Sequence, residues 1–171
     1  MSFPKRSATW FTLFLVGISA AFAGWVATLL AFTFVSIIGI VGVWPYFVEL
    51  YVVKYSLPAA LSSLLIGPLF WWLFIIQPRQ LTLRRGILVG SLSSLVAHPL
   101  FWFLAMVIAS LKGTKIVSVL GIKHLDLIGE LLESLFLSMW SLLFVGWITV
   151  LVGGVVGAVL ALVVAHIERK G

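Results

Sequence analysis

Residues 57–76 read LPAALSSLLIGPLFWWLFII and contain no charged side chain. A helix of about 20 apolar residues is long enough to cross the hydrocarbon core of a bilayer. Three further apolar runs accompany it, so the sequence predicts an all-α integral membrane protein whose 171 residues form a single transmembrane domain. We place the four transmembrane helices at about 9–34, 57–76, 86–111 and 135–165.

The composition of the chain agrees with this prediction. Hydrophobic residues make up 63% of it and charged residues only 9%, whereas soluble domains carry roughly 25% charged residues. The apolar runs are continuous, which excludes the alternating segments of an outer-membrane barrel. Because the chain contains no cysteine, disulfides, thiolate metal sites and cysteine nucleophiles are excluded.

The distribution of Lys and Arg predicts the topology, because cytoplasmic loops carry an excess of both. With four spans and the N-terminus inside, seven basic residues are cytoplasmic and four are outside; splitting the first run into two spans gives six against five. We therefore expect a multi-pass protein of the cell inner (plasma) membrane with both termini cytoplasmic. Arg79, Arg84 and Arg85 form the cytoplasmic basic loop. The net charge of +6 is then explained by the excess of Lys and Arg on the cytoplasmic side, and we expect no nucleic-acid partner.

Two segments outside the four spans have helical character. Residues 34–55 are too apolar for a simple loop, and we expect an interfacial helical segment there, after span 1; the end of a long tilted helix is the alternative. Before span 4, Asp126, Glu130 and Glu133 share one face of an amphipathic helix. We expect this outer acidic stripe to be solvated; a docking stripe for a basic partner or a weak cation site is the alternative.

Spans 2 and 3 contain an internal repeat. LSSLLIGPLFWW at 61–72 and LSSLVAHPLFWF at 92–103 agree at eight of twelve positions. The two spans run in opposite directions, so the repeat is inverted, as in secondary transporters. We expect Pro68 and Pro99 to kink their helices, and the small side chains Ser62, Ser63 and Ser93 to lie where the helices cross. Two similar kinked helices without a transport role are the alternative.

Small residues also mark helix faces that can pack closely. Gly86 and Gly90, like Gly153 and Gly157, have the GxxxG spacing. This spacing lets two membrane helices approach until their backbones touch. The partner helix is predicted to come either from this chain or from another membrane subunit.

His98 is the one ionisable residue at depth in the predicted spans, and such residues are functional candidates. With Ser94 and Trp102 it forms a candidate cofactor- or substrate-binding site. We expect no cofactor there and a neutral histidine bonded to a serine or carbonyl of a neighbouring helix; the alternative is an imidazole that holds a haem or a chlorophyll or bonds a substrate. No metal cluster is predicted.

The sequence lacks the side-chain sets that membrane enzymes need. It has no pair of carboxylates at depth and no zinc-protease, serine-hydrolase or phosphate-loop motif. We therefore expect a small non-catalytic protein, an accessory subunit of a larger membrane complex that contacts the bilayer and partner subunits. A small transporter or lipid-handling protein using the inverted repeat is the first alternative, and a subunit that carries a cofactor on His98 is the second.

Overall fold

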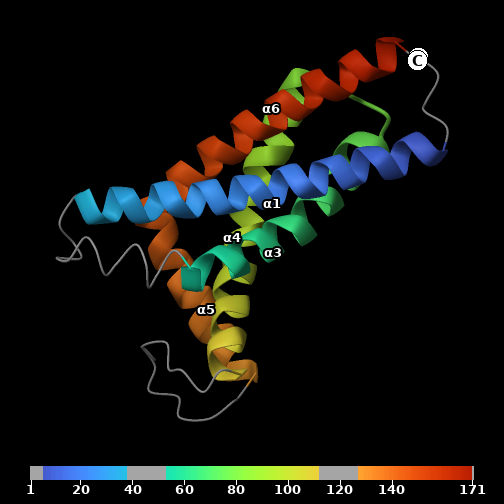
Figure 1. Cartoon of the computed structure of the whole chain (residues 1–171). Helices are drawn as coiled ribbons and strands as arrows, with labels where there is room; N and C mark the ends of the chain where they lie inside the picture. Colours follow the sequence, from blue (N-terminus) through green and yellow to red (C-terminus); the bar gives the residue numbers. More distant parts are fainter. Residues whose placement is uncertain (1–5, 38–52, 112–126, 171) are drawn as a thin grey trace.

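The computed structural model describes residues 6–37, 53–111 and 127–170, and within these ranges every residue is helical except the loop at 77–82 (Figure 1). The elements in chain order are α1 (Arg6–Ile37), α3 (Val53–Trp71), the π-helical turn η2 (Trp72–Ile76), α4 (Leu83–Leu111), α5 (Leu127–Ser141), the π-helical turn η3 (Leu142–Gly146) and α6 (Trp147–Lys170).

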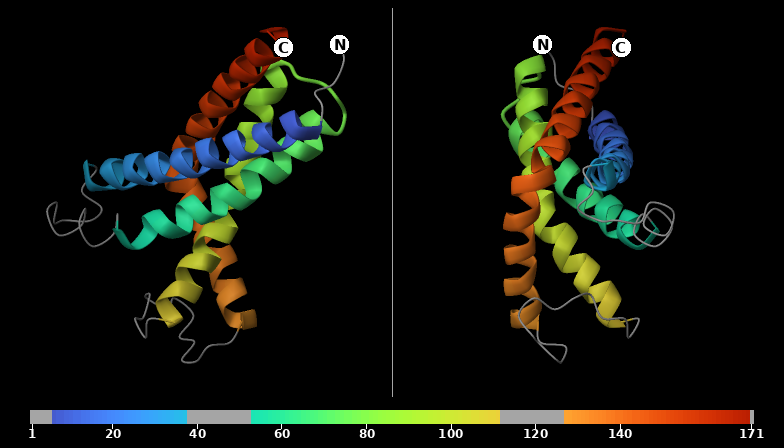
Figure 2. Two further views of the ribbon diagram at one scale, coloured as in Figure 1. Left: turned by 45° about the vertical axis from the view of Figure 1, so that its right-hand side comes forward. Right: turned by 90° about the vertical axis from the view of Figure 1, so that its left-hand side faces the viewer.

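The four predicted apolar helices are confirmed. The described stretches long and apolar enough to cross a membrane are Thr9–Phe34, Tyr55–Ile76, Leu83–Leu111 and Ile128–Ile167. The last one begins earlier than the expected residue 135, because α5 continues through η3 into α6 as one bent helical run (Figure 2). The interfacial segment predicted at 34–55 falls mostly on residues 38–52, which lie outside the described ranges.

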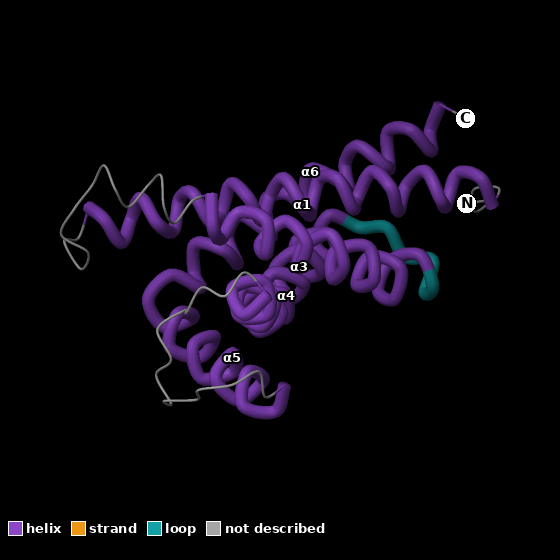
Figure 3. Tube along the Cα trace, turned by 60° about the horizontal axis from the view of Figure 1, so that its bottom comes forward, coloured by secondary structure: helices purple, strands orange, loops and turns teal. Residues whose placement is uncertain are grey.

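The helices form two hairpins that cross each other. The most extensive contacts join α1 to α3 and α4 to α6, while α3 packs on α4 and α1 packs on α6 at the crossing. Figure 3, which looks nearly along α4, shows that helix beside both α3 and α5. The start of α1, the loop at 77–82 and the end of α6 lie at the same end of the molecule (Figure 2).

The two GxxxG faces pack against each other inside the chain. A Cβ on Gly86 would lie 2.5 Å from the Gly157 carbonyl oxygen, and a Cβ on Gly90 would clash with the carbonyl oxygen of Gly153. Glycine is therefore required for the backbones of α4 and α6 to approach this closely. The partner of each small-residue face is thus a helix of this chain.

The prediction that the acidic stripe is solvated is wrong for the two residues that the structure describes. Glu130 and Glu133 are only 7% and 5% exposed, whereas Ile128 on the other side of α5 is 71% exposed. Ser110 of α4 donates a hydrogen bond of 2.7 Å to Oε1 of Glu130. The polar face of α5 packs inward and its apolar face points outward, as on a helix surrounded by lipid. Asp126 lies outside the described residues.

The basic loop holds the start of α4. The Arg85 backbone N–H donates to the Thr82 hydroxyl over 3.3 Å, and Thr82 thereby caps the helix. The Arg85 guanidinium also donates to the Phe74 carbonyl in η2 over 3.3 Å. Arg79 and Arg84 are exposed, so this end of the molecule presents positive charge.

Candidate functional site

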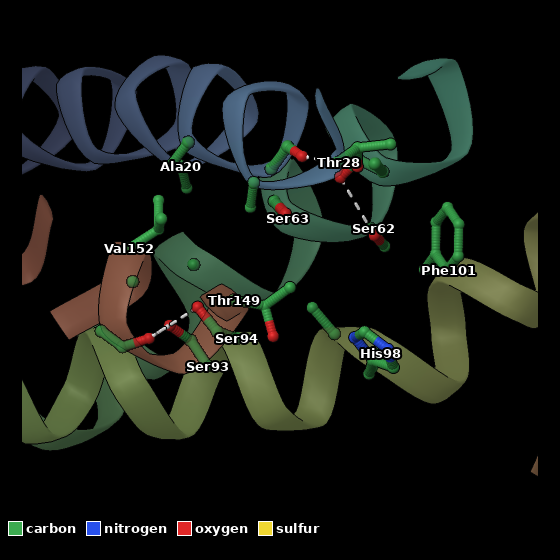
Figure 4. A pocket seen from close by; sticks show the side chains of 18 of the residues that line it. Ala20, Thr28, Ser62, Ser63, Ser93, Ser94, His98, Phe101, Thr149 and Val152 are labelled. Carbon is green, nitrogen blue, oxygen red and sulfur yellow. Dashed lines mark hydrogen bonds between the residues drawn. The ribbon is translucent and has the colours of Figure 1, made fainter. Parts of the chain in front are cut away.

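A pocket of about 480 Å³ lies where the two hairpins cross, and α1, α3, α4 and α6 all contribute to its wall (Figure 4). Most of the wall is apolar. No carboxylate, lysine or arginine occurs among the described residues that line it. Among these residues seven carry hydroxyl side chains: Thr28, Ser62, Ser63, Ser93, Ser94, Ser141 and Thr149.

The two ends of the pocket differ in how far their lining side chains are exposed. At the end near η2 its wall consists of residues from the main hydrophobic cluster, including Trp71 at 2% exposed and Leu160 at 6%. At the end near η3 the wall includes Trp140 and Phe144, which are 56% and 45% exposed. We call the end near η2, where these lining side chains are buried, the closed end, and the end near η3, where they are partly exposed, the open end.

The two copies of the repeat make the same local hydrogen bond at the pocket wall. The Ser62 hydroxyl donates to the Ala59 carbonyl over 3.1 Å, and the Ser93 hydroxyl, 31 residues later, donates to the Gly90 carbonyl over 3.0 Å. Ser94 donates to the same Gly90 carbonyl over 3.0 Å. Each hydroxyl keeps lone pairs for a further donor.

Each copy of the repeat also packs on a glycine of its hairpin partner. A Cβ on Gly24 of α1 would lie 2.7 Å from the Ala59 carbonyl oxygen and 3.0 Å from Cβ of Ser63. A Cβ on Gly153 of α6 would lie 2.5 Å from the Gly90 carbonyl oxygen and 3.0 Å from Cβ of Ser94. Because 59 and 90, like 63 and 94, are equivalent positions, the two hairpins are built alike.

Ser141, the last residue of α5, joins α5 to α4 at the open end of the pocket. Its hydroxyl accepts a hydrogen bond of 2.8 Å from Nε1 of Trp102 and lies 2.9 Å from Nε2 of His98. It donates its own hydrogen to the Ser138 carbonyl over 3.1 Å. A hydroxyl has one hydrogen and two lone pairs, so His98 donates through Nε2 and all three capacities are used.

This hydrogen-bond pattern determines the tautomer of His98. Because Nε2 carries the hydrogen, Nδ1 is a hydrogen-bond acceptor. In the part of the chain that the structure describes, no group donates to Nδ1. No carboxylate of the described residues bonds to that nitrogen either, so within them the Ser141–His98 pair lacks the third group that orients the base of a nucleophilic serine. The imidazole instead offers the pocket one lone pair.

Trp71 and Trp102 occupy equivalent repeat positions but differ in hydrogen bonding. Trp102 donates to Ser141, whereas Nε1 of the buried Trp71 has no hydrogen-bond partner. An unpaired buried donor is uncommon and costs about 1–3 kcal/mol. The difference coincides with the closed and open ends of the pocket.

The structure brings most of the predicted site residues together. His98, Ser94, Trp102, the other repeat serines and three of the four GxxxG glycines line the pocket, while Pro68, Pro99 and Gly86 do not. Prediction from the sequence missed the importance of Trp71, Thr149 and Ser141. The position of Trp71 in the repeat was a signal for that residue, whereas the link from Ser141 to His98 joins residues 43 positions apart.

The described residues contain no group of three or more His, Cys, Asp or Glu side chains able to hold a metal. The absence of a cofactor stays a prediction, and so does its alternative, a haem or chlorophyll on His98, whose metal Nδ1 is left to bind. Comparison of the chain with protein family models, curated proteins and solved structures finds no match.

Proposed function

We propose that the protein binds an uncharged, largely apolar small molecule inside the membrane, as a small transporter or lipid-handling protein. The pocket at the crossing of the two repeat helices is the observation that carries this proposal. Ligand sites are typically concave and mostly apolar, with a few placed polar groups. This pocket has that character, and both copies of the repeat contribute to it.

The wall of the pocket favours a neutral ligand that can donate a hydrogen bond. An ion buried without a countercharge is strongly disfavoured, and the described lining residues offer none. The serine hydroxyls and Nδ1 of His98 offer lone pairs. We therefore expect a molecule with an apolar body and at least one N–H or O–H group.

We propose further that the four helices span the cell inner membrane with both termini in the cytoplasm. The joint position of the two helix ends and the basic loop at one end of the molecule supports this topology (Figure 2). Single cysteines test it, because the chain has none of its own. In intact cells an impermeant thiol reagent is expected to modify His124→Cys and to spare Gln80→Cys; the reverse pattern contradicts the topology.

The accessory-subunit hypothesis loses one of its arguments, because both GxxxG faces pack within the chain and are not available to a partner subunit. It remains a separate prediction. Purification from the native membrane in mild detergent decides between the two functions. Stoichiometric partner subunits would favour the accessory subunit, and a monodisperse species of this chain alone would favour a protein that acts by itself.

Binding is tested with N-phenylnaphthylamine, an uncharged aromatic probe with one N–H donor. In nanodiscs, energy transfer from tryptophan to the probe is expected to contain a saturable part that protein-free lipid lacks. Val152 lines the pocket, whereas Val155 on the same helix is exposed on the outside. Val152→Phe is expected to remove the saturable signal, because the ring fills the pocket, and Val155→Phe is the matched control.

Two results would overturn the binding proposal. One is a purely linear signal with the unmodified protein, which means partition into lipid only. The other is saturable binding that Val152→Phe leaves intact, because the probe then binds elsewhere. Circular dichroism and size-exclusion profiles of both variants verify that each is folded.

A further inference from the structure

The likeness of the two hairpins extends from the repeat helices to their partners. Because Gly24 packs on 59 and 63 as Gly153 packs on 90 and 94, α1 is the counterpart of α6. The same offset pairs Val16 with Val145, and both valines line the pocket. Thr12 lies four residues before Val16, and Ser141 lies four residues before Val145. Thr12 is thus the counterpart of Ser141.

The two hairpins share the same helix packing, but their equivalent tryptophans differ in hydrogen bonding and in the end of the pocket at which they lie. At the open end Trp102 donates to the hydroxyl of Ser141. At the closed end Trp71 is packed in the hydrophobic cluster with Val16, and its Nε1 has no partner. Inverted repeats allow one half to adopt the conformation of the other, which opens the opposite side of a central site.

We propose that the protein has a second conformation, in which the two hairpins exchange states and the pocket opens at the Trp71 end. In that conformation Trp71 donates to the hydroxyl of Thr12, and Trp102 leaves Ser141 and closes its own end of the pocket. The exchange gives access from each side of the membrane in turn and makes the protein a carrier; it rests on the proposed binding function.

Three structural features make this exchange physically reasonable. The indole N–H of Trp71 gains an acceptor in the second state while that of Trp102 loses one, so the exchange leaves the number of paired indoles unchanged. A hydroxyl that already donates one hydrogen bond can still accept, as Ser141 does. Finally, π-helical turns directly follow Trp71 and Ser141, and such turns are frequent at functional sites.

The test uses single cysteines at the two equivalent valines, Val16→Cys and Val145→Cys, in proteoliposomes. A membrane-impermeant methanethiosulfonate reagent is applied to each side. With no other change, Val145→Cys is expected to react and Val16→Cys to react slowly. Adding Ser141→Ala removes the acceptor of Trp102 and shifts the populations, so Val16→Cys is expected to react about two- to tenfold faster, while Val145→Cys reacts more slowly by the fraction of molecules that leave its state.

Two further variants complete the design: one removes the acceptor at the other end of the pocket, and one keeps the hydroxyl of residue 141. Thr12→Val is expected to slow Val16→Cys further and to leave Val145→Cys fully reactive. Ser141→Thr keeps the hydroxyl and is expected to restore the unmodified rates. A faster reaction at one cysteine with a slower reaction at the other indicates an exchange of states. A structure that only becomes less tightly packed would instead react faster at both cysteines.

Two outcomes overturn the exchange: both rates rising together in Ser141→Ala, or neither rate changing. The probe distinguishes this failure from failure of the binding proposal. If saturable N-phenylnaphthylamine binding persists while the reciprocal change is absent, the pocket binds without exchange. If the probe also fails to bind, the binding function is lost as well.

Discussion

The α1–α3 hairpin and the α4–α6 hairpin share a repeat motif and a glycine contact, yet they differ at three places. The first hairpin has Gly67 where the second has His98, and an unpaired Trp71 where the second has a bonded Trp102. The second hairpin is also extended by α5. The shared features form the pocket, whereas the differences lie at its two ends and, under the proposed function, decide where a polar ligand group binds.

The glycine contacts give the largest expected effect on stability. Gly153→Ala is expected to cost about 1–3 kcal/mol of unfolding free energy, because its Cβ meets the backbone of Gly90 and the side chain of Ser94. Gly24→Ala meets the equivalent atoms and is expected to cost a similar amount. Reversible unfolding in mixed detergent micelles measures both.

Gly17→Ala is the control for this prediction. Its Cβ would meet only side-chain atoms of Leu64 and Pro68, at 3.2 and 3.3 Å, and a small effect is expected. If Gly153→Ala is as stable as Gly17→Ala, the two helices do not depend on the close contact, and the likeness of the hairpins loses its structural basis.

The next largest expected effect is the coupling energy between each repeat tryptophan and the hydroxyl residue assigned to it. A double-mutant cycle of Ser141→Ala and Trp102→Phe is expected to give a coupling of about 0.5–1.5 kcal/mol, because the pair shares a hydrogen bond. The equivalent cycle of Thr12→Val and Trp71→Phe is expected to give almost none in the state described. Equal couplings would contradict the assignment of different states to the two hairpins.

His98 is expected to affect ligand binding more than stability of the fold. His98→Ala removes the Nδ1 acceptor, so the affinity for N-phenylnaphthylamine is expected to fall about three- to tenfold. An aromatic probe of similar size without the N–H group is the control, and its affinity is expected to stay within about twofold. A parallel loss for both probes would mean that His98 supports the pocket only by packing.

The repeat serines are expected to give the smallest effects. Ser62→Ala and Ser93→Ala each remove a bond to a carbonyl three residues earlier in the same helix. Such local bonds contribute little to helix stability, so each variant is expected to change the unfolding free energy by less than about 0.5 kcal/mol. Thermal denaturation compares them, and a large difference between the two would show that the repeat positions are not equivalent.

Hydropathy alone predicted the four long helices, and the likeness of residues 61–72 to residues 92–103 suggested the repeat. The error at Glu130 and Glu133 has a physical cause, because an acidic stripe faces water on a soluble protein but faces the protein interior on a helix surrounded by lipid. The hydrogen bonds of Ser141 were not predictable, since periodicity does not specify which helices cross. The equivalence of Thr12 and Ser141 likewise emerges only when the packing of Gly24 and Gly153 is compared.

The central claim is that a ligand occupies the pocket between the two hairpins, and protection of a cysteine tests it most directly. Ser93 lines the pocket and its neighbour Leu92 is exposed on the outside. With N-phenylnaphthylamine at ten times its Kd, modification of Ser93→Cys by N-ethylmaleimide is expected to slow about tenfold, because about nine-tenths of the sites are then filled. Modification of Leu92→Cys is expected to keep its rate. Equal rates for Ser93→Cys with and without the probe would contradict the claim.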